Sequence, residues 1–188
     1  MKILLIIFLL AGAYTPAVGQ RVKKCHRDIV AAAELMHHAY EDEGREIIDS
    51  LLRVNPDNSD ALFLRSLNYW HYGKMDQAIE YCNKSIEANS NRCYYGLGYV
   101  YYCRGDMHSC IYNYDEAIKD YSIALKLTNK RDNIHRCYIL YNRALCYYEK
   151  CEYATAEQDL LNALDCDYNT LNDDILGLID LIHQKEKK

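Results

Sequence analysis

The side chains best able to do chemistry in this sequence are the thiols of its 9 cysteines. Four of them form a C-x6-C pair and a C-x4-C pair: Cys103, Cys110, Cys146 and Cys151. Zinc modules and disulfide oxidoreductases commonly use the tighter C-x-x-C spacing. The chain contains no such pair. The pattern therefore predicts no metal site and leaves two alternatives, disulfides or packed free thiols.

Patterns typical of enzymes are also missing from the sequence. The 7 histidines are scattered, and the adjacent His37 and His38 would point in different directions on a helix. There is no glycine-rich phosphate loop, no G-x-S-x-G and no H-E-x-x-H. The acidic run 41–43 is typical of a solvated helix end. The sequence therefore predicts a non-catalytic protein that needs no cofactor.

The first 19 residues have the layout of a secretory signal peptide. Lys2 precedes an apolar run from Ile3 to Tyr14, and small residues follow at Ala17 and Gly19. This run is too short to span a bilayer comfortably, and no later apolar run reaches membrane length. We expect cleavage at the end of residues 1–19, which gives an exported mature chain that is periplasmic, envelope-associated or secreted.

Three later segments share a pattern of rings and small residues. Each begins with an aromatic residue: Phe63, Tyr95 and Tyr141. Each has a small residue three positions later: Ser66, Gly98 and Ala144. Each then has an alanine, spaced 39 residues from the next: Ala78, Ala117 and Ala156. Small residues let two helices approach closely while rings fill the space beside them, so each segment predicts a helical hairpin.

The middle segment is about seven residues longer than the other two segments, and the additional residues lie between Gly105 and Tyr114. Seven residues are about two helical turns, so an insertion of this length lengthens a helix without rotating its apolar face. We expect the second helix of this hairpin to begin after Asp106, with that side chain as its N-cap.

The segments resemble tetratricopeptide repeats, helix–turn–helix units that stack into an α-solenoid. GKMDQAIEYCNKSIEANS and CEYATAEQDLLNALDCD match the second half of the family pattern, and YNRALCYY matches the first half. The resemblance implies an all-α TPR-like α-solenoid. Its parts would be a weak N-terminal helical repeat at 20–58, three repeats at 59–168, and a capping helix with a charged tail at 169–188. The capping helix is amphipathic through five residues: Leu171, Ile175, Leu178, Ile179 and Ile182.

The resemblance also implies a concave groove lined by the first helix of each repeat. Its residues would be spaced i, i+4 and i+7: Phe63, Leu67, Trp70, Tyr95, Tyr99, Tyr102, Tyr141, Leu145 and Tyr148. Tyrosine and tryptophan are strong interface residues, although rings at these positions also pack between helices, so packing is the alternative. Some family members bind a C-terminal carboxylate with lysines and asparagines along this groove. In this sequence, aromatic and aliphatic residues occupy those positions. We therefore expect no such clamp, and an apolar or aromatic peptide or a flat protein face as the ligand.

Hairpin spacing predicts specific pairings. Arg143 would reach Asp159 across its own hairpin in a structural ion pair. Arg65 faces Tyr81 at the matching place, so its partner is not evident. Antiparallel helices would bring the four cysteines named above to one end, and the best single candidate for a disulfide is Cys110–Cys151.

These observations favour an exported, non-catalytic scaffold that binds another protein or a peptide in an aromatic groove. The net charge of −5 disfavours nucleic acid as the partner. Two alternatives remain. One is a thiol-, disulfide- or metal-dependent exported protein that uses the four-cysteine group, and the other is a structural subunit of an envelope assembly.

Overall fold

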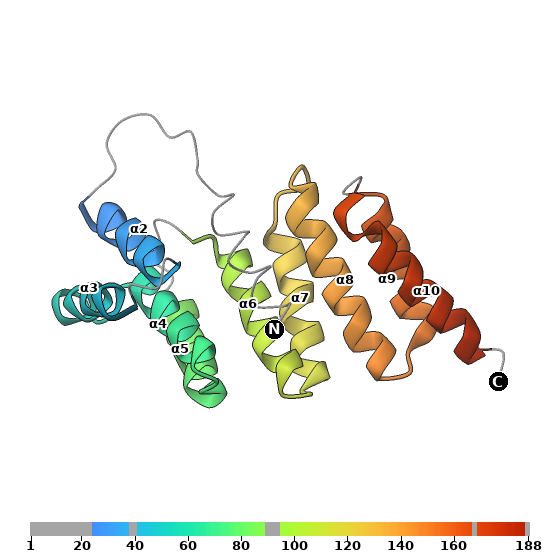
Figure 1. Ribbon diagram of the computed structural model, residues 1–188, viewed down its shortest axis with the longest axis horizontal. Helices are drawn as coiled ribbons and strands as arrows, with labels where there is room; N and C mark the ends of the chain where they lie inside the picture. Colours follow the sequence, from blue (N-terminus) through green and yellow to red (C-terminus); the bar gives the residue numbers. More distant parts are fainter. Residues whose placement is uncertain (1–23, 38–40, 89–94, 167–168, 187–188) are drawn as a thin grey trace. The chain divides into compact units, whose positions relative to one another are not determined.

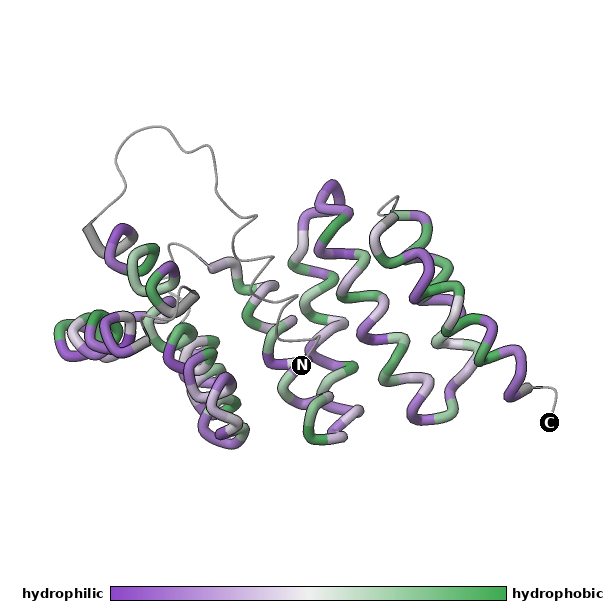
Figure 2. The backbone as a smooth tube through the Cα atoms, in the orientation of Figure 1, coloured by the Kyte–Doolittle hydropathy of each residue, from purple (hydrophilic) through white to green (hydrophobic). Residues whose placement is uncertain are grey.

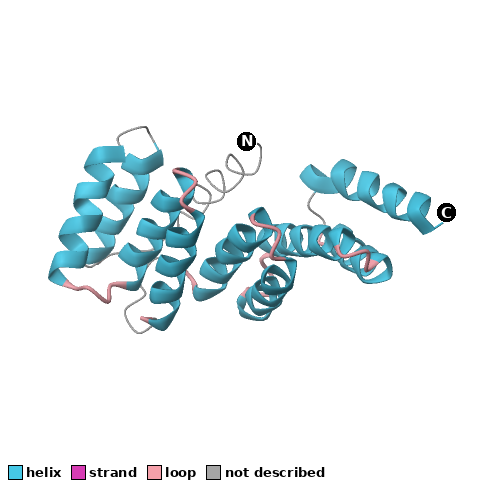
Figure 3. Ribbon diagram, turned by 90° about the horizontal axis from the view of Figure 1, so that it is seen from below, coloured by secondary structure: helices cyan, strands magenta, loops and turns pink. Residues whose placement is uncertain are grey.

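The computed structural model describes residues 24–37, 41–88, 95–166 and 169–186. Within these ranges the chain is helical and has no strand, which confirms the predicted all-α class (Figure 1, Figure 3). The predicted signal peptide, residues 1–19, lies outside the described residues. The helices group into two compact units, one that ends at Tyr95 and one that begins at Gly96. None of the described helices combines the length and apolar character needed to cross a bilayer.

The first unit contains two helical hairpins. They are formed by α2 (Lys24–His37) with α3 (Glu41–Val54), and by α4 (Ser59–His71) with α5 (Met75–Glu87). Asn58 caps α4, because its side-chain oxygen accepts a hydrogen bond from the backbone N–H of Ala61 at 3.1 Å. Hydrophobic and hydrophilic residues are interleaved along each helix, as expected for helices with one buried face (Figure 2).

Small residues lie where α4 and α5 meet, as the sequence pattern predicts. Ser66, Ala78 and Ser85 are all fully buried. Ser66 Oγ lies 3.1 Å from Cys82 Sγ, and Ser85 Oγ donates a hydrogen bond of 2.7 Å to the backbone carbonyl of Ser59. The serines therefore keep the close approach that an alanine would allow and also satisfy their hydroxyl groups.

The second unit contains two further hairpins and a terminal helix. Its elements are α6 (Leu97–Cys110), α7 (Tyr114–Leu127), α8 (Asn133–Glu149), α9 (Tyr153–Leu164), the 3-10 turn η2 (Asn169–Leu171) and α10 (Asn172–Glu186). The five apolar residues predicted to share one face of the last segment are all buried: Leu171, Ile175, Leu178, Ile179 and Ile182. Helix α10 packs on α9 and covers apolar surface there.

The α6–α7 hairpin corrects one prediction. Helix α6 continues through Asp106 to Cys110, and α7 begins only at Tyr114. Helix α6 has 14 residues against 13 in α4, and α7 has 14 against 13 in α5, so the predicted extra residues lengthen neither helix of the hairpin by two turns. Asp106 is a buried residue inside α6 and not a helix cap.

The first helices of three hairpins share a 39-residue register. A residue with positive φ follows each helix: Gly73 at 69°, Tyr112 at 61° and Cys151 at 61°. In this register the middle segment begins at Tyr102 and not at Tyr95, so the predicted register was wrong by seven residues. Tyr95 and Gly98 repeat the spacing of Tyr102 and Gly105 two helical turns earlier, and periodicity alone does not separate the two.

Two glycines in α6 allow α7 to approach closely. A Cβ at Gly98 would lie 3.1 Å from Leu127 Cβ, which confirms the close contact predicted there. A Cβ at Gly105 would lie 2.8 Å from Cε1 of Tyr121, closer than real Cβ atoms come. The Tyr121 ring is 1% exposed and its hydroxyl donates to Asp106, so the ring has little freedom to move away.

Gly105→Ala is therefore expected to lower the free energy of unfolding by about 1–2 kcal/mol, because overpacking outweighs the gain in helix propensity. Gly177→Ala in α10 is the matched control. No atom lies within 4 Å of the added Cβ at Gly177, so this change is expected to stabilise by up to about 1 kcal/mol. Urea denaturation of both variants measures whether each change raises or lowers the free energy of unfolding. Equal stabilisation by both would contradict the tight α6–α7 contact.

Candidate functional site

In the first unit, the predicted groove residues belong mainly to the core. Phe63 and Trp70 on α4 are 0% and 6% exposed, and Leu67 is half-buried. The Phe63 ring packs edge-on against Tyr95, with 4.8 Å between the ring centroids. Tyr95 is itself buried and precedes α6. These rings contribute to packing within the first unit, which is the alternative that the spacing leaves open.

On α6 the predicted rings divide between surface and core. Tyr99 is half-buried, and its ring meets the ring of His135 edge-on at 6.2 Å between centroids. Tyr102 is 3% exposed. In the 39-residue register, the α6 counterparts of Leu67 and Trp70 are Asp106 and Ser109. Neither residue belongs to the predicted groove set.

Asp106 is the centre of a buried polar network between α6, α7 and α8. Its Oδ1 accepts hydrogen bonds from the Tyr121 hydroxyl at 2.6 Å and from Asn142 Nδ2 at 2.9 Å. Asn142 Nδ2 also donates to the Tyr102 hydroxyl at 3.2 Å. Asp106 Oδ2 has no hydrogen-bond partner among the described residues. Burial raises the pKa of Asp106 to about 7, although the hydrogen bonds from Tyr121 and Asn142 lower it.

Helix α8 presents the most exposed part of the predicted stripe. Tyr141, Leu145 and Tyr148 are all half-buried, and their spacing places them on one face of the helix. We call these three residues the α8 face. The Tyr148 ring also contacts the ring of Tyr153 in α9, with centroids 5.6 Å apart. Large side chains that keep part of their surface in water on a rigid helix are suited to contact another molecule.

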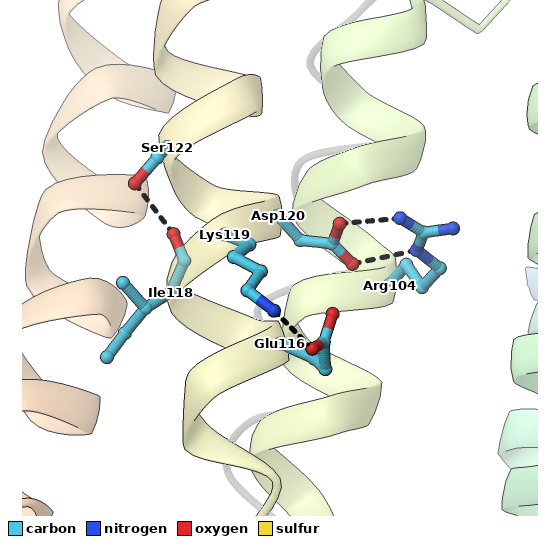
Figure 4. Close-up of polar contacts among 6 residues, drawn as sticks. All are labelled: Arg104, Glu116, Ile118, Lys119, Asp120 and Ser122. Carbon is cyan, nitrogen blue, oxygen red and sulfur yellow. Dashed lines mark hydrogen bonds and ion pairs between the residues drawn. The ribbon is translucent and has the colours of Figure 1, made fainter.

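Two arginine–aspartate pairs fix the hairpins of the second unit. Arg143 Nε and Nη2 each donate to Asp159 at 2.7 Å, which confirms the predicted ion pair. Arg104 binds Asp120 in the same bidentate way, at 2.7 and 2.6 Å (Figure 4). Both pairs span 16 residues and join the two helices of one hairpin. They hold the α8 face and α6 in place from within their own hairpins.

Arg65, in the matching place of the first unit, uses a different partner. Its guanidinium pairs with Asp49 of the preceding helix α3. The position across the hairpin is occupied by Tyr81, which stacks on Tyr69 with 5.2 Å between centroids. The same arginine position therefore binds across its own hairpin in the second unit and back to the previous hairpin in the first.

The four cysteines predicted to gather at one end lie in different environments. Cys103 and Cys146 are fully buried, whereas Cys110 and Cys151 are exposed free thiols. The predicted Cys110–Cys151 disulfide is absent from the structure. Cys103 lies in the middle of α6 and Cys110 ends it, because the register differs from the predicted one.

The buried thiols are not suited to nucleophilic chemistry. Burial raises the pKa of Cys137 and of Cys146 to about 11, and nucleophilic thiols need a lowered pKa. Within the described residues, no three His, Cys, Asp or Glu side chains cluster as metal ligands would.

Comparisons with known proteins agree with this architecture. Residues 42–92 match a family model described as tetratricopeptide repeat. Human sperm-associated antigen 1 is 44% identical over 52 residues, which is 28% of this chain and only 5% of that protein.

Three solved structures share the fold at low sequence identity. PilF of Pseudomonas aeruginosa superposes with a TM-score of 0.73 at 15% identity, over 87% of this chain and 69% of that one. YrrB, described as a TPR protein with an unusual peptide-binding site, has a TM-score of 0.69 at 13% identity, over 85% and 76%. MamA has a TM-score of 0.67 at 15% identity, over 89% and 87%. The fold is therefore all-α and TPR-like, with a repeat-family match at residues 42–92.

Proposed function

We propose that this chain of TPR-like hairpins is an exported, non-catalytic scaffold that binds a peptide or a protein surface on the α8 face. Proteins built from such repeats generally bind other proteins or peptides, and YrrB is described as having a peptide-binding site. Export rests on the N-terminal pattern of residues 1–19. Mass spectrometry of the exported protein checks it, because the expected first residue is Gln20 and an intact Met1 would contradict cleavage.

The observation that carries the binding proposal is the partial exposure of Tyr141, Leu145 and Tyr148 together. Their counterparts in the first unit, Phe63 and Trp70, are buried and are needed for packing. A ligand that covers the α8 face would remove apolar surface from water at about 25 cal/mol per Å². Binding would also need little ordering of the protein, since the two tyrosines and the leucine already stand on a helix held by the Arg143–Asp159 pair.

Binding to the α8 face is tested with a peptide selected from a random library on the immobilised full-length chain. Leu145→Ala with Tyr148→Ala is expected to weaken the binding of that peptide about tenfold or more. Truncating central apolar and aromatic contacts removes most of the interface energy. Fluorescence anisotropy of the labelled peptide measures the dissociation constant.

Leu161→Ala with Tyr112→Ala is the matched control. Leu161 is 45% exposed on α9 and Tyr112 is 79% exposed in the α6–α7 turn, so the pair removes similar side chains outside the α8 face. The control should leave the dissociation constant unchanged. Equal weakening by both pairs, or no effect of the α8 pair in a folded chain, would move the binding site elsewhere.

A further inference from the structure

A polar cleft of about 530 Å³ lies in the second unit between α7, α8 and α9. Its polar lining consists of Lys130, Asn133, Arg136, Arg143, Asn162 and Asp165. Asn133, Arg136 and Arg143 are spaced by three and seven residues, so they share one side of α8. The α8 face of Tyr141, Leu145 and Tyr148 lies on a different side of that helix.

Three cations line the cleft, but only one of them is neutralised. The Arg143 guanidinium binds Asp159, and its Nη1 donates to Ser122 Oγ at 2.9 Å. Arg136 and Lys130 form no ion pair and no side-chain hydrogen bond within the described part of the chain. Arg136 is half-buried, so it has given up part of its hydration without gaining an anion. An anionic ligand would restore that lost interaction.

One acidic residue restricts which anion fits. Asp165 also lines the cleft and has no ion-pair partner among the described residues. The uncompensated charges of the lining are then two positive and one negative. The net uncompensated charge of the lining is therefore a single positive charge, which a singly charged carboxylate neutralises and a doubly charged phosphate exceeds. The amides of Asn133 and Asn162 add neutral donors, and the planar fork of Arg136 matches a carboxylate in two parallel hydrogen bonds.

We propose that this cleft binds a carboxylate side chain from an acidic segment of a partner protein, with Arg136 as the main donor and Lys130 at the rim. The contact would be a second docking point for the scaffold proposed above. It does not require the α8 face, because the two sets of residues lie on different sides of α8.

The test uses a fluorescently labelled oligoglutamate peptide titrated with the full-length chain at low and at physiological ionic strength. Arg136→Gln is expected to weaken binding about tenfold, as the loss of a charge-assisted hydrogen-bonded pair does. Arg131→Gln is the matched control, since Arg131 is an exposed cation in the same loop region that does not line the cleft. Equal weakening by both variants would mean diffuse attraction to a basic loop and would overturn the site.

Asp165→Asn provides a test in the opposite direction. Removing the repelling charge is expected to strengthen the binding of oligoglutamate severalfold. Inorganic phosphate should then compete with oligoglutamate for the cleft, whereas in the wild type it should not. Unchanged affinity in Asp165→Asn, or phosphate competing equally in the wild type, would contradict a carboxylate site. Lys130→Gln, at an exposed position, replaces Arg136→Gln if that variant does not fold. Oligoglutamate binding should survive Leu145→Ala with Tyr148→Ala, so failure at the cleft and failure at the α8 face are distinguishable.

Discussion

Asp106→Asn is expected to stabilise the chain at about pH 8 by on the order of 3 kcal/mol and to change little at about pH 4. Asp106 is 3% exposed, and burial raises its pKa from 3.8 to about 7. The folded chain therefore holds a proton on this carboxyl where the unfolded chain has already released it. Asparagine has nearly the same shape, keeps an acceptor oxygen for Tyr121 and Asn142, and does not ionise.

The sign of the pH dependence follows from the raised pKa. Below about pH 4 the carboxyl is neutral in both states, and its contribution to stability is fully present. As the pH rises toward about 7, the unfolded state gains the favourable ionisation first, so the contribution of Asp106 to wild-type stability falls. The neighbours do not titrate in this window, since burial raises the pKa of Tyr102 and Tyr121 well above the ordinary value and that of Cys146 to about 11.

Urea denaturation of wild type and Asp106→Asn across this pH range measures the effect. The difference between the two free energies of unfolding should grow from near zero at low pH to its full value above about pH 7. Asp180→Asn, at an exposed carboxylate on α10, controls for the loss of a surface charge. Parallel stability curves for the two proteins, or a difference that shrinks as the pH rises, would contradict a protonated buried Asp106.

Arg143→Ala is expected to lower the free energy of unfolding by about 3 kcal/mol. Asp159 is 5% exposed, and both of its oxygens receive their hydrogen bonds from Arg143 at 2.7 Å. Truncating the arginine leaves a buried carboxylate without its partner and also frees the Ser122 hydroxyl. The cost comes mainly from that stranded charge and not from the attraction itself.

Two further variants separate the stranded charge from the loss of the arginine side chain. Arg143→Met with Asp159→Leu removes both charges and fills similar volume, so it should recover most of the stability lost in Arg143→Ala. Lys119→Ala breaks an exposed ion pair with Glu116 on α7 and should have little effect, because water screens that pair (Figure 4). If Arg143→Ala and Lys119→Ala change the urea midpoint equally, the buried pair has no special role.

The sequence predicted the hairpins and one of their internal ion pairs because both depend on local spacing. Arg143 and Asp159 are 16 residues apart, a distance set by one helix, one turn and the next helix. The equivalent pair of Arg104 with Asp120 was missed, since the middle hairpin was placed seven residues too early. Tyr95 and Gly98 repeat the spacing of Tyr102 and Gly105 seven residues earlier in the sequence, so only the position of the turn decides between them.

The candidate site was less predictable than the fold. Spacing of i, i+4 and i+7 selects one side of a helix but does not say what covers that side. Phe63 and Trp70 are covered by packing within the first unit, whereas Tyr141, Leu145 and Tyr148 keep partial contact with water. The cleft beside Arg136 depends on residues from three helices, and no single helix pattern indicates it.

The 39-residue register has a consequence for how such a chain can change by recombination. Loss of residues 104–142 would join Cys103 directly to Arg143, so the first turns of α6 would continue into the last turns of α8. The arginine would still precede Asp159 by 16 residues. Asp106, Tyr121 and Asn142 all lie inside the lost segment, so the buried carboxylate would leave together with both of its donors. A crossover in this register deletes or duplicates one whole set of mutually dependent residues at a time.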